Sequence, residues 1–173
     1  MADQFDSGSL LPQAVDIYVG LGSNLENPLQ QVNQALVELT QLPHTELIQH
    51  SQLYRSDPVG PAGQPDYINA VAQLCSRLQP ETLLDQLQAL EQSHRRVRLQ
   101  HWGPRTLDLD ILLFGNQLIN SERLSIPHPY IAERSFVLYP LHEIASGLQF
   151  PDGRHIDQLI AGCDMGTLAP VEV

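Results

Sequence analysis

Lysine is absent from this sequence of 173 residues, and its nine basic residues are all arginines. With 20 acidic residues, the formal net charge is −11 at neutral pH. Binding to a nucleic-acid backbone or to an anionic membrane surface needs positive charge spread over one face of a protein. The composition therefore argues against a nucleic-acid binder and against attachment to a membrane surface.

Cysteines and long apolar segments are also scarce. Cys75 and Cys163 lie far apart, which excludes a closely spaced zinc motif and favours a reducing cytoplasmic environment. No apolar run approaches the roughly 20 residues that span a bilayer. The N-terminus lacks the basic and apolar regions of a secretory signal. We expect a cytoplasmic protein that acts as a monomer.

The length and composition predict one domain with short ends. Residues 1–13 are polar and aperiodic, which predicts a disordered or loosely docked lead-in. Residues 14–165 are expected to form a single domain, since a hydrophobic fraction of 42% is sufficient for a core. Residues 166–173 are expected to be a tail.

The periodicity of the apolar residues predicts the order β, α, β, β, α, β. The expected strands and helices cover residues 15–19, 28–40, 44–54, 67–74, 80–91 and 108–114. This order is that of the ferredoxin-like fold, an α+β architecture with helices on one face of an antiparallel sheet. Residues 116–160 add a C-terminal hairpin and helix extension, with Pro140 interrupting its longer helical stretch.

The glycines at 20 and 22 follow the first expected strand. The phosphate-binding fingerprints fail here, because the motif lacks its third glycine and the whole chain has no lysine. The pattern therefore predicts a tight turn from strand to helix.

Four of the nine arginines fall within residues 95–105, which we call the arginine segment. Directly after it, Asp108 and Asp110 flank Leu109 at the head of an apolar run. Residues at i and i+2 of a strand point to the same face. Two aligned carboxylates beside an arginine cluster are suited to divalent metal plus polyphosphate. The alternative is a pair of solvated residues on an edge strand.

Five blocks of this sequence resemble the 6-hydroxymethyl-7,8-dihydropterin pyrophosphokinase family of the folate pathway. They are GLGSN at 20–24, YRSDPVGPAGQPDYIN at 54–69, EQSHRRVR at 91–98, WGPRTLDLDILLFG at 102–115 and IPHPYIAERSF at 126–136. The resemblance implies a ferredoxin-like core that binds ATP, as co-substrate, with two Mg²⁺ ions. It also implies transfer of the β,γ-diphosphate to the hydroxymethyl group of the pterin.

The resemblance assigns roles on the ATP side of the reaction. Asp108 and Asp110 match the residues that hold the metal ions, which would neutralise charge on the transferring phosphorus. The residues matching phosphate or nucleotide contacts are Gln88, Glu91, Arg96, Arg98, Arg105, His128 and Arg134. Together, Arg96, Arg98, Arg105 and the two aspartates form the implied catalytic set. Several modest contacts are expected, without an essential base, because such clamping is mainly positioning and electrostatics. For any one arginine, the alternative is a surface salt bridge.

On the pterin side, the resemblance points to a loop and to aromatic and amide side chains. The matching positions are Ser56, Asp57, Pro58, Val59, Tyr67, Asn69, Trp102 and Phe136. Aromatic faces stack on a flat ring, and an amide reads its donor and acceptor edge. Trp102 is expected on a mobile loop that closes over the substrate. Tyr67 and Phe136 have an alternative role as core aromatics.

A second class of function is a catalytically inactive ferredoxin-like module that senses a nucleotide or another ligand. An inactive sensor is expected to lose one of the paired aspartates, yet Asp108 and Asp110 are both present. An RNA-binding sheet of the same fold would need a basic, aromatic face. The charge of −11 and the aromatic content of 6% disfavour it.

Overall fold

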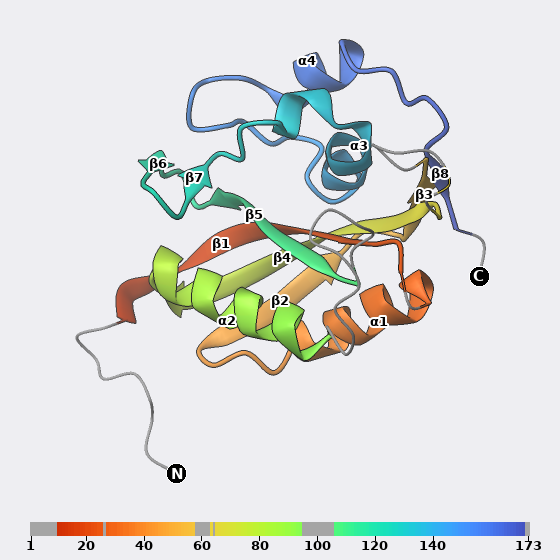
Figure 1. Cartoon of the computed structure of the whole chain (residues 1–173). Coiled ribbons are helices and arrows are strands. Elements are labelled where there is room, and N and C mark those ends of the chain that lie inside the picture. The colour runs from red at the N-terminus through yellow and green to blue at the C-terminus, as the bar shows by residue number, and fades with distance from the viewer. Residues whose placement is uncertain (1–9, 26, 58–62, 64, 95–105, 172–173) are drawn as a thin grey trace.

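The computed structural model describes residues 10–25, 27–57, 63, 65–94 and 106–171 (Figure 1). The strands are β1 (Leu10–Ser23), β2 (Thr45–His50), β3 (Tyr54–Ser56), β4 (Tyr67–Leu78), β5 (Asp108–Phe114), β6 (Ile119–Asn120), β7 (Ser125–Ile126) and β8 (Ala169–Pro170). The helices are α1 (Pro28–Leu39), α2 (Pro80–Ser93), the 3₁₀ turn η1 (Ile131–Glu133), α3 (Ser135–Ile144) and α4 (Ile156–Ala161).

The main sheet places β1 and β4 at its centre. Its strand order is β5-β1-β4-β3-β8, and β2 also pairs with β4. Each of these pairings is antiparallel. The expectation of an α+β protein with an antiparallel sheet is confirmed. The segment expected as one strand over 44–54 is divided between β2 and β3.

Helices α1 and α2 pack side by side on one face of the sheet, below it in Figure 1. Each begins with a proline at its first position, where the missing N–H costs no helical hydrogen bond. Their inner faces carry buried residues at helical spacing, namely Val32, Ala35, Leu36 and Leu39 in α1 and Leu83, Leu84 and Leu87 in α2. These residues join the larger hydrophobic core.

The opposite face of the sheet is covered by the C-terminal extension, above the sheet in Figure 1. A second buried cluster joins Val71 and Leu112 of the sheet to Val137 and Leu141 of α3 and to Ile156 of α4. We had expected helices on one face only. The second face is too apolar to be left in water, so the extension is part of the fold.

Both ends of the predicted domain need correction. Leu10 is buried and pairs with Leu78, and Arg77 Nε donates to the carbonyl of Leu11 at 2.8 Å. Residues 10–13 therefore belong to β1 and not to a lead-in. At the other end, Val171 N–H donates to Leu53 at 2.8 Å as β8 extends the sheet beyond β3. Residues 169–171 are therefore not a loose tail.

The predicted glycine turn is also wrong. β1 runs through Gly20 and Gly22 to Ser23, and it pairs with β4 and β5 along this stretch. The chain then enters α1 through Asn27, which has a left-handed conformation with φ of 62°. The glycines therefore lie within a central strand, where their missing side chains leave space on the sheet.

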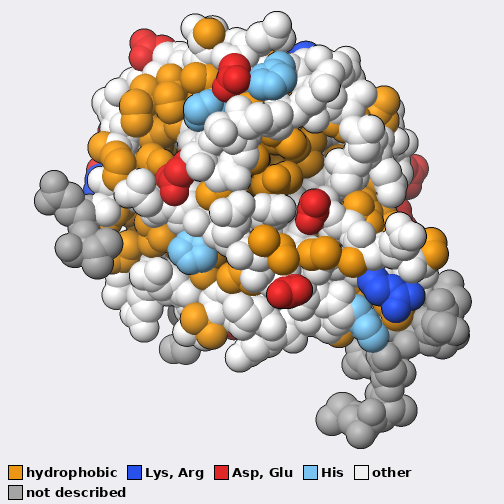
Figure 2. Space-filling view, turned by 180° about the vertical axis from the view of Figure 1, so that it is seen from behind, with side chains coloured by type: hydrophobic (Ala, Val, Ile, Leu, Met, Phe, Trp, Pro, Cys, Tyr) orange, Lys and Arg blue, Asp and Glu red, His pale blue; other side chains and the backbone are white. Residues whose placement is uncertain are grey.

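The surface carries few basic side chains among the described residues. On the face seen in Figure 2, basic side chains occupy small separate areas, whereas acidic and apolar side chains are more widespread. Within the described residues, no helix combines the length and apolar character needed to cross a membrane.

Candidate active site

Asp108 and Asp110 lie on one face of β5, as their spacing predicts. Between and beside them, Leu107, Leu109 and Ile111 are buried in the core with α1 and α2. Because strand residues alternate between faces, the two carboxylates lie on the opposite side, where both line the same cleft. The strand thus uses one face for packing and the other for chemistry.

The two glycines of β1 lie directly across from these aspartates. Gly20 pairs with Asp110, and Gly22 pairs with Asp108. Paired residues on neighbouring strands share a face, so glycine leaves open space beside each carboxylate. A Cβ on Gly22 would lie 3.4 Å from Asn69 Oδ1. The glycines therefore shape the cleft, which is the role that the turn prediction missed.

This first cleft has a volume of about 490 Å³ and opens between the sheet and the segment that leads into α3. It gathers many of the residues implied by the resemblance from five separate parts of the chain. They are Ser56, Asp57, Tyr67, Asn69, Asp108, Asp110, His128, Arg134 and Phe136. Gly20 and Gly22 also line it, as do Tyr130 and Glu133, which the sequence analysis did not single out.

A buried amide forms part of the cleft wall. Asn69 is 3% exposed, and its Nδ2 donates to Ser56 Oγ at 2.8 Å. Ser56 is also buried and pairs with Tyr67 in the β3–β4 ladder. Since buried polar groups with partners hold fixed positions, this wall presents a preset hydrogen-bonding edge.

The other wall places an arginine between two aromatic rings. The Arg134 guanidinium carbon lies 5.1 Å from the ring centre of Tyr130 and 5.8 Å from that of Phe136. Such contacts stabilise the cation and fix its plane. Phe136 therefore contacts Arg134 as well as lining the cleft.

His128 is set against β5 by its backbone N–H, which donates to Leu112 at 3.0 Å. Its Nδ1 accepts from the Tyr130 N–H at 3.3 Å, so in the neutral ring the proton is on Nε2. Burial, and next the charge of Arg134, lower the pKa of His128 from its usual value. His128 is thus a neutral donor beside the positive charge of Arg134.

A second cleft of about 300 Å³ lies beside α2 and the β6–β7 hairpin. It contains Gln88 and Glu91, the two predicted nucleotide residues of α2. Glu91 Oε2 accepts from the Leu109 N–H at 2.9 Å, which ties α2 to the strand between the two aspartates. The sequence analysis did not assign Arg123, which also lines this cleft and whose Nη2 donates to Asp85 at 2.6 Å and to Gln88 at 3.2 Å.

The two clefts meet at Asp110 and His128, which line both of them. A molecule in the first cleft and a molecule in the second would therefore face each other across one carboxylate and one imidazole. This arrangement is suited to transfer of a group between two bound substrates.

Six of the predicted site residues lie outside the described residues. They are Pro58, Val59, Arg96, Arg98, Trp102 and Arg105. Their assigned roles, including the closing of Trp102 over the substrate, stay predictions.

The chemistry of the β5 face fits magnesium. Mg²⁺ prefers oxygen ligands and is commonly held by one or two carboxylates together with waters and substrate phosphates. Asp108 and Asp110 supply two such carboxylates in one cleft. In the described part of the chain, no group of three or more acidic, histidine or cysteine side chains forms a metal cage. Two carboxylates suit a Mg²⁺ ion whose remaining ligands are phosphate oxygens and waters.

Comparison with known proteins decides the family. The profile of 7,8-dihydro-6-hydroxymethylpterin-pyrophosphokinase (HPPK) matches residues 18–146, most of the chain. The chain belongs to this family. The matched range contains the two aspartates of β5 and the residues described above that line either cleft.

Two bacterial members of the HPPK family are close relatives. The 2-amino-4-hydroxy-6-hydroxymethyldihydropteridine pyrophosphokinase of Pseudomonas aeruginosa is 54% identical over 147 residues, covering 85% of this chain and 91% of that protein. The protein of the same name from Haemophilus influenzae is 50% identical over 146 residues, covering 84% of this chain and 91% of that protein.

A solved structure of the family shares the fold. The wild-type HPPK-DHPS of Plasmodium falciparum matches with a TM-score of 0.67 and 13% sequence identity. The match covers 90% of this chain and 42% of that protein, so this chain spans less than half of its length. At this identity the likeness concerns the fold alone.

Proposed function

We propose that this protein transfers the β,γ-diphosphate of ATP to the hydroxymethyl group of 6-hydroxymethyl-7,8-dihydropterin. The hydroxymethyl oxygen loses its proton and bonds to the β-phosphorus. The bond from that phosphorus to the oxygen shared with the α-phosphate breaks, and AMP leaves with this oxygen. The products are the pterin diphosphate and AMP, which places the enzyme in folate biosynthesis.

The pterin occupies the first cleft in this proposal. Asn69 and Ser56 form a buried hydrogen-bonded edge for the ring, and Tyr67 and Phe136 supply aromatic faces. Asp57 lines the same cleft, and Pro58, Val59 and Trp102 complete the proposed pterin set. The rigidity of the edge supports selection of a ring with a matching pattern of donors and acceptors.

ATP occupies the second cleft and extends toward Asp110. Gln88 and Glu91 line the nucleotide end, and Arg123 adds a cation that the sequence analysis did not assign. His128 donates from Nε2 and Arg134 supplies positive charge at the junction. The proposed phosphate contacts also include Arg96, Arg98 and Arg105. Several such contacts hold the triphosphate in line with the hydroxymethyl group.

Asp108 and Asp110 would hold Mg²⁺, and we propose two ions. When bound, the metal neutralises negative charge on the phosphates. The protein's own contribution is to present both carboxylates on one face of β5, with Gly20 and Gly22 leaving space beside them.

We propose that the catalytic unit is a single ferredoxin-like domain with a C-terminal extension, acting as a cytoplasmic monomer. With β2 and β3 counted as one divided strand, the order from β1 to β5 is β-α-β-β-α-β, and this order and the antiparallel pairings support the ferredoxin-like classification. The free thiols of Cys75 and Cys163 are compatible with a reducing compartment. The buried ends at Leu10 and Leu168 support a domain that reaches from 10 to 171.

The observation that carries the proposal is the meeting of two clefts at Asp110 and His128. The test is incubation of the purified protein with the pterin, ATP and Mg²⁺, followed by separation of the products. We expect AMP and the pterin diphosphate in equal amounts, and no reaction without a divalent metal. Production of ADP, or turnover that is indifferent to chelation of the metal, would contradict the mechanism. An inactive sensing module would bind ATP and release neither product.

A further inference from the structure

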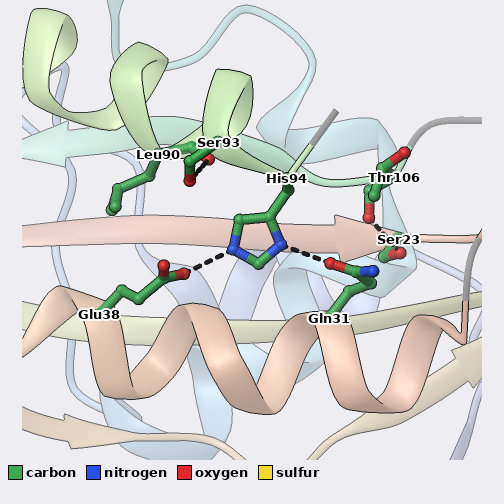
Figure 3. A network of polar contacts seen from close by, with 7 residues as sticks. All are labelled: Ser23, Gln31, Glu38, Leu90, Ser93, His94 and Thr106. Atoms are coloured by element: carbon green, nitrogen blue, oxygen red, sulfur yellow. Dashed lines mark hydrogen bonds and ion pairs between the residues drawn. The ribbon is translucent and has the colours of Figure 1, made fainter. Parts of the chain in front are cut away.

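His94 is a buried titratable residue that contacts neither cleft. It directly precedes the arginine segment and ends α2 as its C-cap residue. Its side chain is only 6% exposed and lies between α2 and α1 (Figure 3). A polar ring at such a position needs partners for both nitrogens.

Both nitrogens of His94 face side chains of α1. Nε2 donates to Glu38 Oε1 at 2.5 Å, because an ionised carboxylate only accepts. Nδ1 faces Gln31 Oε1 on the other side of the ring, and it donates to this oxygen when the imidazole carries a proton on both nitrogens. Gln31 and Glu38 are seven residues apart, which places them two turns apart on one face of α1. The imidazole thus bridges two turns of a neighbouring helix.

The residue that follows the arginine segment in the sequence is bonded to the same part of the fold as His94. Thr106 directly follows the segment and is buried. Its carbonyl accepts from Ser23 Oγ, at the end of β1 (Figure 3). The two residues that flank the segment are therefore both bonded to the β1–α1 unit.

The last turn of α2 also carries the second cleft. Glu91 lies three residues before His94, so the two are neighbours in the last turn of the helix. Glu91 lines the second cleft and accepts from Leu109 of β5. Two side chains of this turn are thereby bonded to different elements, Glu91 to β5 and His94 to α1.

We propose that His94 is a positioning residue for the ATP side of the reaction. By bonding to Gln31 and Glu38, it holds the last turn of α2 so that Glu91 and Gln88 line the second cleft. The residues of the first cleft lie on other elements, so the pterin side does not depend on this bridge. The inference rests on the proposed function.

The test compares the two substrates in one assay. His94→Phe keeps a ring of similar size and removes both hydrogen bonds. We expect the KM for ATP to rise about tenfold, while the KM for the pterin changes by less than about twofold. His94→Gln keeps an N–H that can reach Glu38, so it should recover part of the affinity for ATP.

Leu42→Ala is the control for stability alone. Leu42 is buried near the end of α1 and lines neither cleft. The variants are compared at a temperature below the unfolding midpoint of each. Should His94→Phe fail to fold, Glu38→Ala removes the main acceptor and leaves the ring in place. For Glu38→Ala we expect a rise of about threefold in the KM for ATP alone, because the contact of His94 with Gln31 remains.

Each result decides a separate question. A selective rise in the KM for ATP that Leu42→Ala does not reproduce supports the proposal. An equal rise for both substrates, an unchanged KM for ATP, or the same selective rise in Leu42→Ala would overturn it. Absence of AMP formation by the wild-type protein would refute the proposed function itself, which the same assay reports first.

Discussion

The two clefts are built from different kinds of structure. The walls of the first cleft come largely from strands, and two of its polar side chains, Ser56 and Asn69, are buried, with Asn69 only 3% exposed. The second cleft is walled by α2 and the β6–β7 hairpin, and its Arg123 side chain is 43% exposed. The first cleft thus has a buried hydrogen-bonded edge, whereas the second has an exposed cation on its wall.

This difference corresponds to two physical tasks. Selecting one flat ring requires a preset edge, because a wrong ring then leaves buried polar groups without partners. Holding a flexible triphosphate requires several charges, none of which needs to be buried deeply. Substitutions in the first cleft should therefore act on the pterin, and those in the second on ATP.

The largest effect is expected where the clefts meet. Asp110→Ala removes a carboxylate that lines both, and we expect kcat to fall on the order of 1,000-fold because the metal loses a ligand. Asp110 is exposed, so the unfolding midpoint should stay close to that of the wild type. AMP formation and thermal unfolding are measured in parallel. Asp152→Ala, on an exposed turn, is the control and should keep full activity.

The second-largest effect is expected at the hydrogen-bonded pair of Asn69 and Ser56 in the wall of the first cleft. Asn69→Ala leaves Ser56 without its amide partner and removes the group that orients the ring. A lost buried hydrogen bond costs about 1–3 kcal/mol, so the KM for the pterin should rise about 10- to 100-fold.

The KM for ATP should stay near the wild-type value in Asn69→Ala. Gln73→Ala serves as the control, because Gln73 lies on the same strand and bonds to Gln49 away from both clefts. If Asn69→Ala raised the KM for ATP as much as the KM for the pterin, the division of tasks between the clefts would be wrong.

A smaller, purely steric effect is expected from Gly22→Ala. The added methyl would lie 3.4 Å from Asn69 Oδ1 and 3.9 Å from Tyr67 Cδ1. We expect a rise of about tenfold in the KM for the pterin, because the methyl occupies space that the pterin ring needs in the first cleft. Gly20→Ala is the matched variant, since its methyl would meet the flexible end of Leu112, also at 3.4 Å. Equal effects of the two variants would show that the space beside Asn69 has no special role.

The smallest effect concerns pH and His128. Its pKa is lowered in the folded protein, so the unfolded chain binds the proton more readily below about pH 6.5. The contribution of His128 to stability is therefore fully present above about pH 6.5, and it is lost as the pH falls through the lower folded value. We expect the unfolding midpoint of His128→Gln to fall less than that of the wild type between about pH 7.5 and about pH 5. If the unfolding midpoints of the two proteins fell equally with pH, the assignment of a neutral, half-buried His128 ring would be wrong.

Much of the fold follows from local sequence patterns. The apolar spacing of α1 and α2, the prolines at their first positions and the alternation around Asp108 and Asp110 are local signals, and the structure confirms the elements that they predict. The gathering of predicted residues in two adjoining clefts agrees with the resemblance to the family.

The errors arose where distant residues decide the structure. Gly20 and Gly22 continue a strand because β4 and β5 pair with it on both sides. Residues 10–13 and 169–171 are ordered by pairing with strands far along the chain. Arg123 was missed because its partners, Asp85 and Gln88, lie on another element. None of these contacts leaves a periodic signal in the sequence.

The central claim is that the hydroxymethyl oxygen of a pterin in the first cleft attacks the β-phosphorus of ATP in the second. An ¹⁸O label in the hydroxymethyl group tests it directly, with mass spectrometry of both products. The label should be retained in the pterin diphosphate, in the oxygen that joins carbon to phosphorus, and AMP should carry none. Loss of the label from the pterin product, or its appearance in AMP or phosphate, would contradict attack by this oxygen.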